Sequence, residues 1–172
     1  KKIVTTVDAS MAVDDLGLNV VRTRVGDAFV SQEMRSGGEL GGEPSGCWIF
    51  PNVSYCPDGI YAAALIARLA GDGDISRLVD GLPSYHTIRG SLASNGTRMD
   101  GLRERMGEMR PQAISDLDGL KLTFPDGWLL IRPSGTEPLI RVSAEARTGA
   151  RARELYRDAV RAVKGILKVS AV

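Results

Sequence analysis

The stretch LKLTFPDGWLLIRPSGTEPLIRVSA, residues 120–144, decides the fold of the second half of this chain. Its apolar and β-branched residues fall into three short runs, Leu120–Phe124, Trp128–Ile131 and Leu139–Ala144, each typical of a β-strand. Pro125-Asp126-Gly127 predicts a tight turn between the first two runs, because Pro presets φ and Gly accepts the left-handed conformation that closes a hairpin. The sequence therefore predicts a β-hairpin that is followed, after a longer loop, by a third strand.

The loop between the second and third strands carries residue types suited to bind phosphate. Ser134 and Thr136 each bring a hydroxyl, and Gly135 permits a close approach of the backbone or a left-handed turn. Backbone N–H groups that no ladder consumes can form a concave anion nest in such a loop. Arg132 and Arg141 flank it with planar guanidinium groups, which match phosphate oxygens bidentately. These five residues are the predicted phosphate-binding site.

The same residue types also fit a hydrophilic hairpin loop without a ligand. In that alternative the two arginines pair with Glu137 and Glu145 of the same chain. Residue types alone leave both interpretations open.

The rest of the second half predicts a small α+β unit, residues 86–172, with a few-stranded sheet and a C-terminal helix. A strand is expected at Thr87–Ala93 and a helix at Met99–Met109. Ala150–Leu167 predicts an amphipathic helix whose buried face carries Leu155, Ala159, Val163 and Ile166. Its opposite face is basic, but acidic residues interleave with the cations, which favours a solvated face over a nucleic-acid interface.

The first half, residues 1–82, predicts a Rossmann-like α/β layered domain. Strands are expected at Lys1–Val7 and Leu18–Thr23. Helices are expected at Met11–Leu16, Asp27–Arg35, Gly59–Ala70 and Ile75–Leu82, the last two capped by Asp58 and Asp74. Pro83-Ser84-Tyr85 is the predicted hinge between the two domains, because Pro ends the preceding helix and nothing there is periodic.

The segment Gly41-Gly42-Glu43-Pro44-Ser45-Gly46-Cys47 has too much Gly and Pro for a regular element and predicts a shaped loop. It presents the carboxylate of Glu43 and the hydroxyl of Ser45 together. This pair suits a sugar, because a carboxylate can accept hydrogen bonds from adjacent hydroxyls. Alternatively, Glu43 accepts backbone N–H groups within its own turn.

A further candidate is Arg22-Thr23-Arg24-Val25-Gly26-Asp27, which runs from a strand end into a helix start. Alternate spacing predicts that Arg22 and Arg24 share one face of the strand, where they could add positive charge to a cleft. An ion pair with Asp14 or Asp15 fits equally well, so both interpretations stay open.

Composition excludes several classes of function. The chain has 172 residues, of which 43% are apolar and 25% charged, as in a soluble globular protein with one or two domains. A net charge of +1 provides no field that would attract nucleic acid or acidic lipid. The longest apolar run, Ile60–Ala70, contains Arg68 and is too short to span a bilayer. We therefore expect no nucleic-acid partner and no membrane partner.

Histidine and cysteine are sparse, which gives little support to Ser-His-Asp catalysis or to metal chemistry that needs several histidines. His86 is the only histidine, and Cys47 and Cys56 amount to neither a disulfide framework nor a zinc site, which favours a reducing, cytoplasmic location. No signal peptide is visible, and a first residue of Lys1 suggests that further residues lie upstream.

No magnesium-type cluster is expected within the chain either. Asp72 and Asp74 form one acidic pair, and Asp116 and Asp118 another, but neither has a third carboxylate at that spacing. Both pairs are interpreted as helix caps and turn formers.

At these loops the sequence resembles the α-D-phosphohexomutase superfamily, which includes phosphomannomutase, phosphoglucomutase and phosphoglucosamine mutase. RPSGTEP at 132–138 is similar to the phosphate-binding signature of that family's fourth domain, and GEPSG at 42–46 to the sugar-binding loop of its third. RTRVGD at 22–27 and DGLKL at 118–122 lie where the family carries similar segments. The resemblance spans essentially the whole chain and keeps the motif order, so it implies the third and fourth domains of a phosphohexomutase.

The resemblance implies a four-domain enzyme, an intramolecular phosphotransferase that interconverts hexose 1-phosphate and hexose 6-phosphate through a phosphoserine and a bisphosphate intermediate. The serine and a Mg²⁺ held by three aspartates would belong to the first and second domains, so this chain alone would be inactive. By position, the predicted phosphate-binding residues would hold the phosphate that is not transferred, while Glu43 and Ser45 would bind sugar hydroxyls. The implied partners are a hexose phosphate and the N-terminal domains of the same polypeptide.

Two residues depart from the family pattern. Cys47 stands where relatives often have His, and a thiol is a weak hydrogen-bond partner. Arg24 stands where many relatives have Lys; it is the one candidate catalytic residue here, although Arg does not deprotonate and is poorly suited to proton transfer.

Two alternatives come from other functional classes. One is a stand-alone phosphosugar-binding module without catalysis, which would sense or present its ligand. The other is a purely structural pair of domains, which predicts no binding of phosphosugars.

Overall fold

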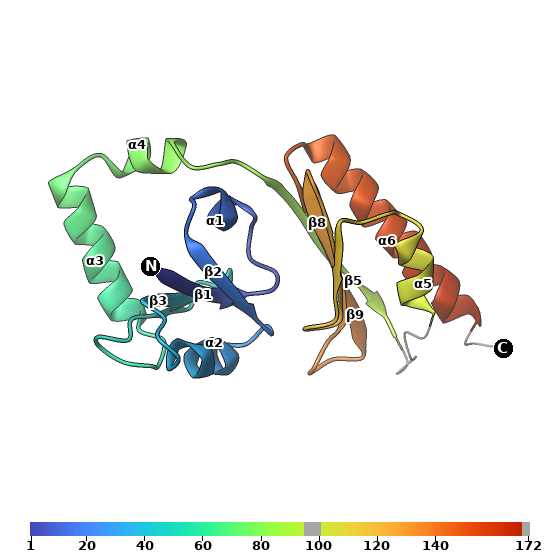
Figure 1. Ribbon diagram of the computed structural model, residues 1–172, viewed down its shortest axis with the longest axis horizontal. Helices are drawn as coiled ribbons and strands as arrows, with labels where there is room; N and C mark the ends of the chain where they lie inside the picture. The colour runs from blue at the N-terminus through green and yellow to red at the C-terminus, as the bar shows by residue number, and fades with distance from the viewer. Residues whose placement is uncertain (95–100, 170–172) are drawn as a thin grey trace. The chain divides into compact units, whose positions relative to one another are not determined.

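The computed structural model describes residues 1–94 and 101–169. The chain forms two compact units, Lys1–Ser84 and Tyr85–Val172 (Figure 1).

The first unit is built on a four-stranded sheet. Its strands are β1 (Lys2–Thr6), β2 (Asn19–Thr23), β3 (Leu40–Gly42) and β4 (Trp48–Ile49), in the order β2-β1-β3-β4. β1 pairs in parallel with both β2 and β3, and only β4 runs antiparallel. Because the carboxyl ends of parallel strands meet at one edge of a sheet, the segments that follow β2 and β3 emerge at the same edge, on either side of β1.

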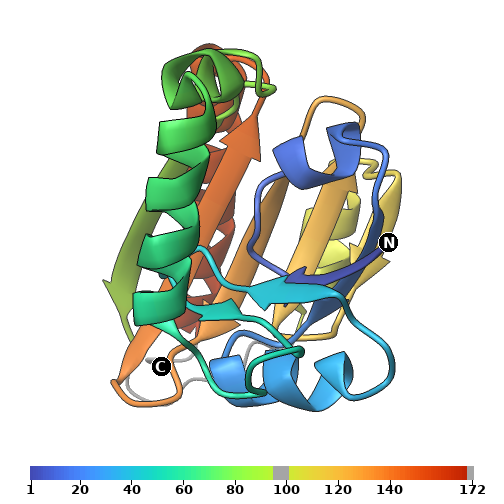
Figure 2. The same ribbon diagram turned by 90° about the vertical axis from the view of Figure 1, so that its left-hand side faces the viewer.

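Four helices accompany this sheet: α1 (Ala12–Asp15), α2 (Asp27–Met34), α3 (Gly59–Asp72) and α4 (Ile75–Asp80). Only α2 is packed deeply on the strands, and its Val30 and Met34 are fully buried against Val4 and Ile49. Figures 1 and 2 both show α2 along the lower side of the strands and α3 beside them. The small apolar cluster under α2 is therefore the core of the first unit.

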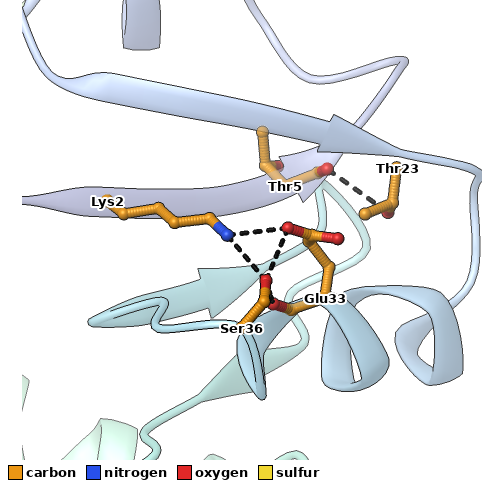
Figure 3. Close-up of polar contacts among 5 residues, drawn as sticks. All are labelled: Lys2, Thr5, Thr23, Glu33 and Ser36. Carbon is orange, nitrogen blue, oxygen red and sulfur yellow. Dashed lines mark hydrogen bonds and ion pairs between the residues drawn. The ribbon is translucent and has the colours of Figure 1, made fainter.

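Polar contacts reinforce the packing of α2 on β1 (Figure 3). Lys2 Nζ donates to Glu33 Oε1 at 2.7 Å and to Ser36 Oγ at 2.8 Å. Ser36 Oγ in turn donates to Glu33 Oε1 at 2.8 Å, and the hydrogen bonds that Glu33 accepts, first from Lys2 and then from Ser36, hold its pKa below the usual value. Thr23 Oγ1 donates to the carbonyl of Thr5 at 3.4 Å, which adds a contact between β2 and β1. The start of β1 is thus tied to the end of α2.

The face of the sheet opposite α2 is less filled. It carries an apolar cavity of about 470 Å³, lined by β1, α1 and β3 and by part of the Gly41–Cys47 segment. Helix α3 does not fill this space: of its side chains only Ala62 is buried, and Ile60 is 87% exposed. The predicted caps of α3 and α4 are confirmed, since Asp58 and Asp74 accept backbone N–H groups of the first turns.

The second unit is built on a five-stranded sheet in which every pairing is antiparallel. Its strands are β5 (His86–Ala93), β6 (Ala113–Ser115), β7 (Leu120–Phe124), β8 (Gly127–Pro133) and β9 (Leu139–Ala146), in the order β5-β9-β8-β7-β6. β7 and β8 form the predicted hairpin, with Phe124 opposite Gly127 and a two-residue connection between them.

Two helices, α5 (Leu102–Gly107) and α6 (Gly149–Val169), cover one face of this sheet. The face of α6 predicted to be buried is confirmed: Leu155 and Ala159 are fully buried, Val163 nearly so, and Ile166 packs at the margin. Alternate residues of the central strands, such as Ile131 and Val142, complete the core. No helix in the described part of the chain is long and apolar enough to cross a membrane.

The predicted architecture, an α/β unit followed by an α+β unit with a C-terminal helix, is confirmed, but some local predictions are wrong. Gly41 and Gly42 belong to β3 rather than to an irregular loop, and the short strands β4 and β6 were not predicted. Gly127 does not take a positive φ; glycine is needed there because a side chain would collide with the backbone of β9. The helix expected at Met99–Met109 is described only from Leu102, and its first part lies outside the described residues.

Replacing Leu155 by Ala should lower the free energy of unfolding of the second unit by about 2–5 kcal/mol, because it removes a fully buried side chain from the core. The chain has two tryptophans, Trp48 in the first unit and Trp128 in the second. Urea unfolding followed by Trp128 fluorescence in a Trp48→Phe background therefore reports on the second unit.

The matched control for this prediction is Leu117→Ala, at a leucine that is 39% exposed in the same unit. Its free energy of unfolding should change by less than about 0.5 kcal/mol. Equal losses in the two variants would show that α6 does not contribute to the core as described.

Candidate functional site

The segment expected to bind phosphate connects β8 to β9. The pairing of β8 with β9 continues beyond Ile131, the predicted end of the strand: Arg132 lies opposite Arg141, and Pro133 lies opposite Ile140. A hydrogen bond of 2.7 Å from the N–H of Ser134 to the carbonyl of Leu139 extends the ladder by one more step. Arg132 is therefore a strand residue rather than a loop residue, and the free loop is limited to residues 134–138.

This pairing puts both predicted arginines on one face of the sheet. Residues directly opposite each other in an antiparallel pair project to the same side. Ile131 and Val142, one step along each strand, face the buried core instead. The guanidinium groups of Arg132 and Arg141 therefore emerge on the face opposite α6.

Each arginine is held by a carboxylate. Arg141 Nη2 donates to Glu137 Oε2 at 2.7 Å, and its Nε lies 3.4 Å from Ser134 Oγ. Arg132 Nη1 lies 3.8 Å from Asp118 Oδ2. The alternative expectation is thus confirmed for the pair formed by Arg141 and Glu137, whereas Asp118 was not expected as a partner.

Glu145, the other carboxylate of that alternative, is buried and engaged elsewhere on the sheet. Its two oxygens accept hydrogen bonds from Trp128 Nε1 at 3.1 Å and from Thr87 Oγ1 at 3.0 Å. It therefore helps to fix β9 against β5 and β8.

The loop itself offers unpaired backbone donors. Across the part of the chain that the structure describes, the N–H groups of Gly135, Thr136 and Glu137 donate to no other group. Gly135 was expected to permit a left-handed turn or a close approach of the backbone, but its φ is not positive and a Cβ there would meet nothing within 4 Å. Open space at Gly135 and three consecutive free donors are features that an anion nest needs.

The second candidate loop, Glu43–Cys47, joins β3 to the antiparallel β4. The N–H of Glu43 donates to the carbonyl of Cys47, and the N–H of Gly46 donates to the carbonyl of Glu43, each at 3.0 Å. Gly46 has a φ of +93°, a conformation that side chains rarely adopt. This closed turn presents Glu43 and Ser45 at the carboxyl edge of the sheet.

Glu43 links this loop to the one that follows β2. Its Oε1 accepts the N–H of Gly26 at 2.6 Å, and its Oε2 accepts the hydroxyl of Ser45 at 3.1 Å. The predicted alternative, in which Glu43 bonds only within its own turn, therefore misses the contact with Gly26. A carboxylate has about four acceptor positions, so two contacts leave room for sugar hydroxyls.

The two arginines near the end of β2 lie beside different partners. Arg22 makes two hydrogen bonds to Asp14, at 2.7 and 2.9 Å, which confirms the expected ion pair. Arg24 lies just beyond the strand, is exposed, and has its guanidinium 5.8 Å from the centre of the Phe29 ring. Arg24 is therefore exposed just beyond the end of β2, whereas Arg22 is engaged by Asp14.

Cys47 is the last residue of the Glu43–Cys47 loop and precedes β4. Partial burial, and then the negative charges of Glu43 and Asp27, raise the pKa of its thiol. The thiol therefore stays protonated near neutral pH and cannot act as a charged contact.

Metal ligands are not assembled here. Within residues 1–94 and 101–169 no three His, Cys, Asp or Glu side chains come together in an arrangement that could hold a metal ion. The donor set of these described residues does not fit a Mg²⁺ site.

Comparisons with known proteins match both units. Residues 1–85 match the family description "Phosphoglucomutase/phosphomannomutase, alpha/beta/alpha domain III", and residues 89–162 match "Phosphoglucomutase/phosphomannomutase, C-terminal domain". The chain belongs to the α-D-phosphohexomutase family and corresponds to its C-terminal half.

Similar curated proteins are longer than this chain. A probable phosphoglucosamine mutase of Methanocella arvoryzae is 48% identical over 170 residues, covering 94% of this chain and 39% of that protein. A protein of the same description from Pyrococcus horikoshii is 40% identical over 178 residues, covering 97% of this chain and 40% of that protein. The chain thus spans about two fifths of the length of these relatives.

Solved structures share the fold. A phosphoglucomutase/phosphomannomutase family protein from Burkholderia thailandensis has a TM-score of 0.73 at 28% identity, over 96% of this chain and 37% of that one. An N-acetylphosphoglucosamine mutase from Aspergillus fumigatus, solved with GlcNAc-6P and magnesium, has a TM-score of 0.72 at 18% identity, over 96% and 39% of the two chains.

The environment of Cys47 predicts a difference in thiol reactivity. Cys56 is exposed, whereas Cys47 is half-buried beside Glu43. Iodoacetamide at pH 8 should alkylate Cys56 at least about fivefold faster, because only the accessible thiolate reacts. Peptide mass spectrometry over time measures the two rates in one sample.

The variant Glu43→Gln removes one of the negative charges that raise the pKa of Cys47, so it should speed alkylation of Cys47 and leave Cys56 unchanged. Glu39→Gln, at an exposed carboxylate paired with Lys1, is the control. Faster alkylation in the control as well would show that the effect does not come from Glu43.

Proposed function

We propose that this chain is the substrate-binding C-terminal half of a phosphohexomutase that interconverts hexose 1-phosphate and hexose 6-phosphate. The observation that carries the proposal is the arrangement at the end of β8 and β9. Arg132 and Arg141 emerge on one face next to three consecutive free N–H groups, in a chain that belongs to this family. Guanidinium forks and oriented backbone donors are the groups that recognise a phosphate dianion.

In this proposal the chain binds and orients the substrate and does not itself transfer phosphate. The N–H groups of residues 135–137, the hydroxyls of Ser134 and Thr136, and the two arginines hold the phosphate that is not being transferred. The carboxylate of Glu43 accepts hydrogen bonds from sugar hydroxyls, and the hydroxyl of Ser45 donates or accepts a further one. Fixing the distant phosphate presents the reacting one in line with its partner, which lowers the entropic part of the barrier.

Phosphate binding would replace Glu137 as the partner of Arg141. In the structure, Glu137 of the loop forms an exposed ion pair with that guanidinium at 2.7 Å. Exposed pairs of this kind contribute about 0–1 kcal/mol, so a dianion that also collects backbone donors can displace the carboxylate at small cost.

The remaining chemistry is assigned to residues outside this chain. A phosphoserine would donate and regain the phosphoryl group through a bisphosphate sugar, and a Mg²⁺ ion would neutralise charge on the transferring group. The names of the similar curated proteins make glucosamine phosphate the first substrate to test. We propose that the polypeptide acts in the cytoplasm.

Isothermal titration calorimetry with glucosamine 6-phosphate tests the proposal directly. The chain should bind this ligand more tightly than unphosphorylated glucosamine. Arg132→Ala should weaken binding at least about tenfold, because a charge-assisted contact is lost. Arg103→Ala, at an arginine of the same unit that pairs with Asp116, is the control and should bind normally.

An unchanged dissociation constant for Arg132→Ala at fixed salt would remove Arg132 from the site, and no binding by the unaltered chain would favour a purely structural role. Mutase activity separates the remaining alternatives. The chain alone should show no turnover, and the polypeptide that includes the upstream domains should be active. Binding without turnover by that longer polypeptide would support a phosphosugar-binding module.

Glu43→Gln should change selectivity among sugars more than affinity for phosphate. The amide can still accept the N–H of Gly26, but it loses the charge that favours hydrogen bonds from hydroxyl or ammonium groups. The ratio of Kd values for glucosamine, glucose and mannose 6-phosphates should shift by about threefold or more, with inorganic phosphate unaffected. Equal losses for all three sugars would contradict the role of Glu43.

A further inference from the structure

The turn before β7 lies directly beside Arg132. β7 and β8 pair with Leu120 opposite Ile131, so the next step of the same register brings Gly119 next to Arg132. Gly119 has a φ of +79°, and a Cβ at this position would lie 2.5 Å from Cβ of Arg132 and would also collide with the carbonyl of Ile131. Only glycine allows the turn to approach the strand so closely.

This close approach brings a carboxylate to the guanidinium group. Asp118 Oδ2 lies 3.8 Å from Arg132 Nη1, and the side chains are only 23% and 21% exposed. The pair is thus better shielded from water than the one formed by Arg141 and Glu137, whose side chains are 46% and 52% exposed. Shielding strengthens the attraction between opposite charges, which partly offsets the greater separation of the Arg132–Asp118 pair, 3.8 Å against 2.7 Å for Arg141 and Glu137.

The pair also counters a local repulsion. Arg132 and Arg141 lie directly opposite each other, and like charges at such positions destabilise each other. Asp118 approaches Arg132 from the β7 side, whereas Arg141 lies on the β9 side. The negative charge of Asp118 therefore offsets the repulsion between the two arginines and favours one position of the Arg132 side chain before any ligand binds.

We propose that Asp118 is a positioning residue for phosphate recognition: it holds the Arg132 guanidinium in the orientation that receives the phosphate, and Gly119 makes the approach possible. The inference rests on the proposed function, since it requires Arg132 to contact phosphate. Unlike Glu137, Asp118 lies outside the loop and keeps its contact when phosphate binds. A side chain ordered in advance loses less conformational entropy on binding, which favours affinity.

Asp118→Asn tests this proposal, because the amide keeps the shape of the side chain but loses its charge. Calorimetry on the whole 172-residue chain should show binding of glucosamine 6-phosphate weakened by about five- to tenfold. Asp118→Glu should restore part of the lost affinity. Asp116→Asn is the matched control: two residues away it removes the carboxylate partner of Arg103, and its affinity should stay within about twofold.

A double-mutant cycle separates positioning from a general structural role. If Asp118 acts through Arg132, then Asp118→Asn added to Arg132→Ala should cause no further loss of affinity. Additive losses, or normal binding by Asp118→Asn, would overturn the inference while leaving the proposed function intact. Normal binding by Arg132→Ala would remove Arg132 from the site and overturn this inference, whereas no binding by the unaltered chain would overturn the proposed function as well.

Discussion

The pairing register of β8 and β9 is the constraint on which the candidate phosphate site depends. A slip of one residue would send either Arg132 or Arg141 to the opposite face of the sheet. Burial prevents this slip, because Ile131 and Val142 alternate with the arginines and are fully buried under the helices. The apolar core of the second unit thus fixes the position of charged groups on the other face.

The sequence predicts the elements whose pattern is local and repeated. The hairpin of β7 and β8 and the apolar face of α6 follow from alternation and helical spacing, and the structure confirms them. Short strands such as β3 escape this reasoning, because Gly41 and Gly42 have low strand propensity and are held in the sheet by β1 and β4. Exposure of α3 was also not predictable, since spacing shows an apolar face but not whether another layer covers it.

For the candidate site, the sequence identifies residue types but not their partners. The predicted turn of three residues, Pro125–Gly127, would have placed Pro133 opposite Gly119. The two-residue connection in the structure instead brings Gly119 next to Arg132, so the proximity of Asp118 was not predicted. Nor was the contact from Gly26 to Glu43, because it joins loops after different parallel strands. The order of strands in the sheet decides which loops meet, and a linear sequence does not contain it directly.

The carboxylates near the arginines need not argue against a phosphate site. Two guanidinium groups forced onto one face repel each other, and nearby carboxylates offset that repulsion in the unliganded chain. The two pairs differ in a way that suits different tasks. Asp118 is shielded and lies in the turn before the neighbouring strand β7, which suits the proposed task of orienting Arg132 throughout binding. Glu137 is exposed and part of the loop, so a phosphate can replace it. Ion pairing and phosphate recognition are therefore compatible properties of the same residues.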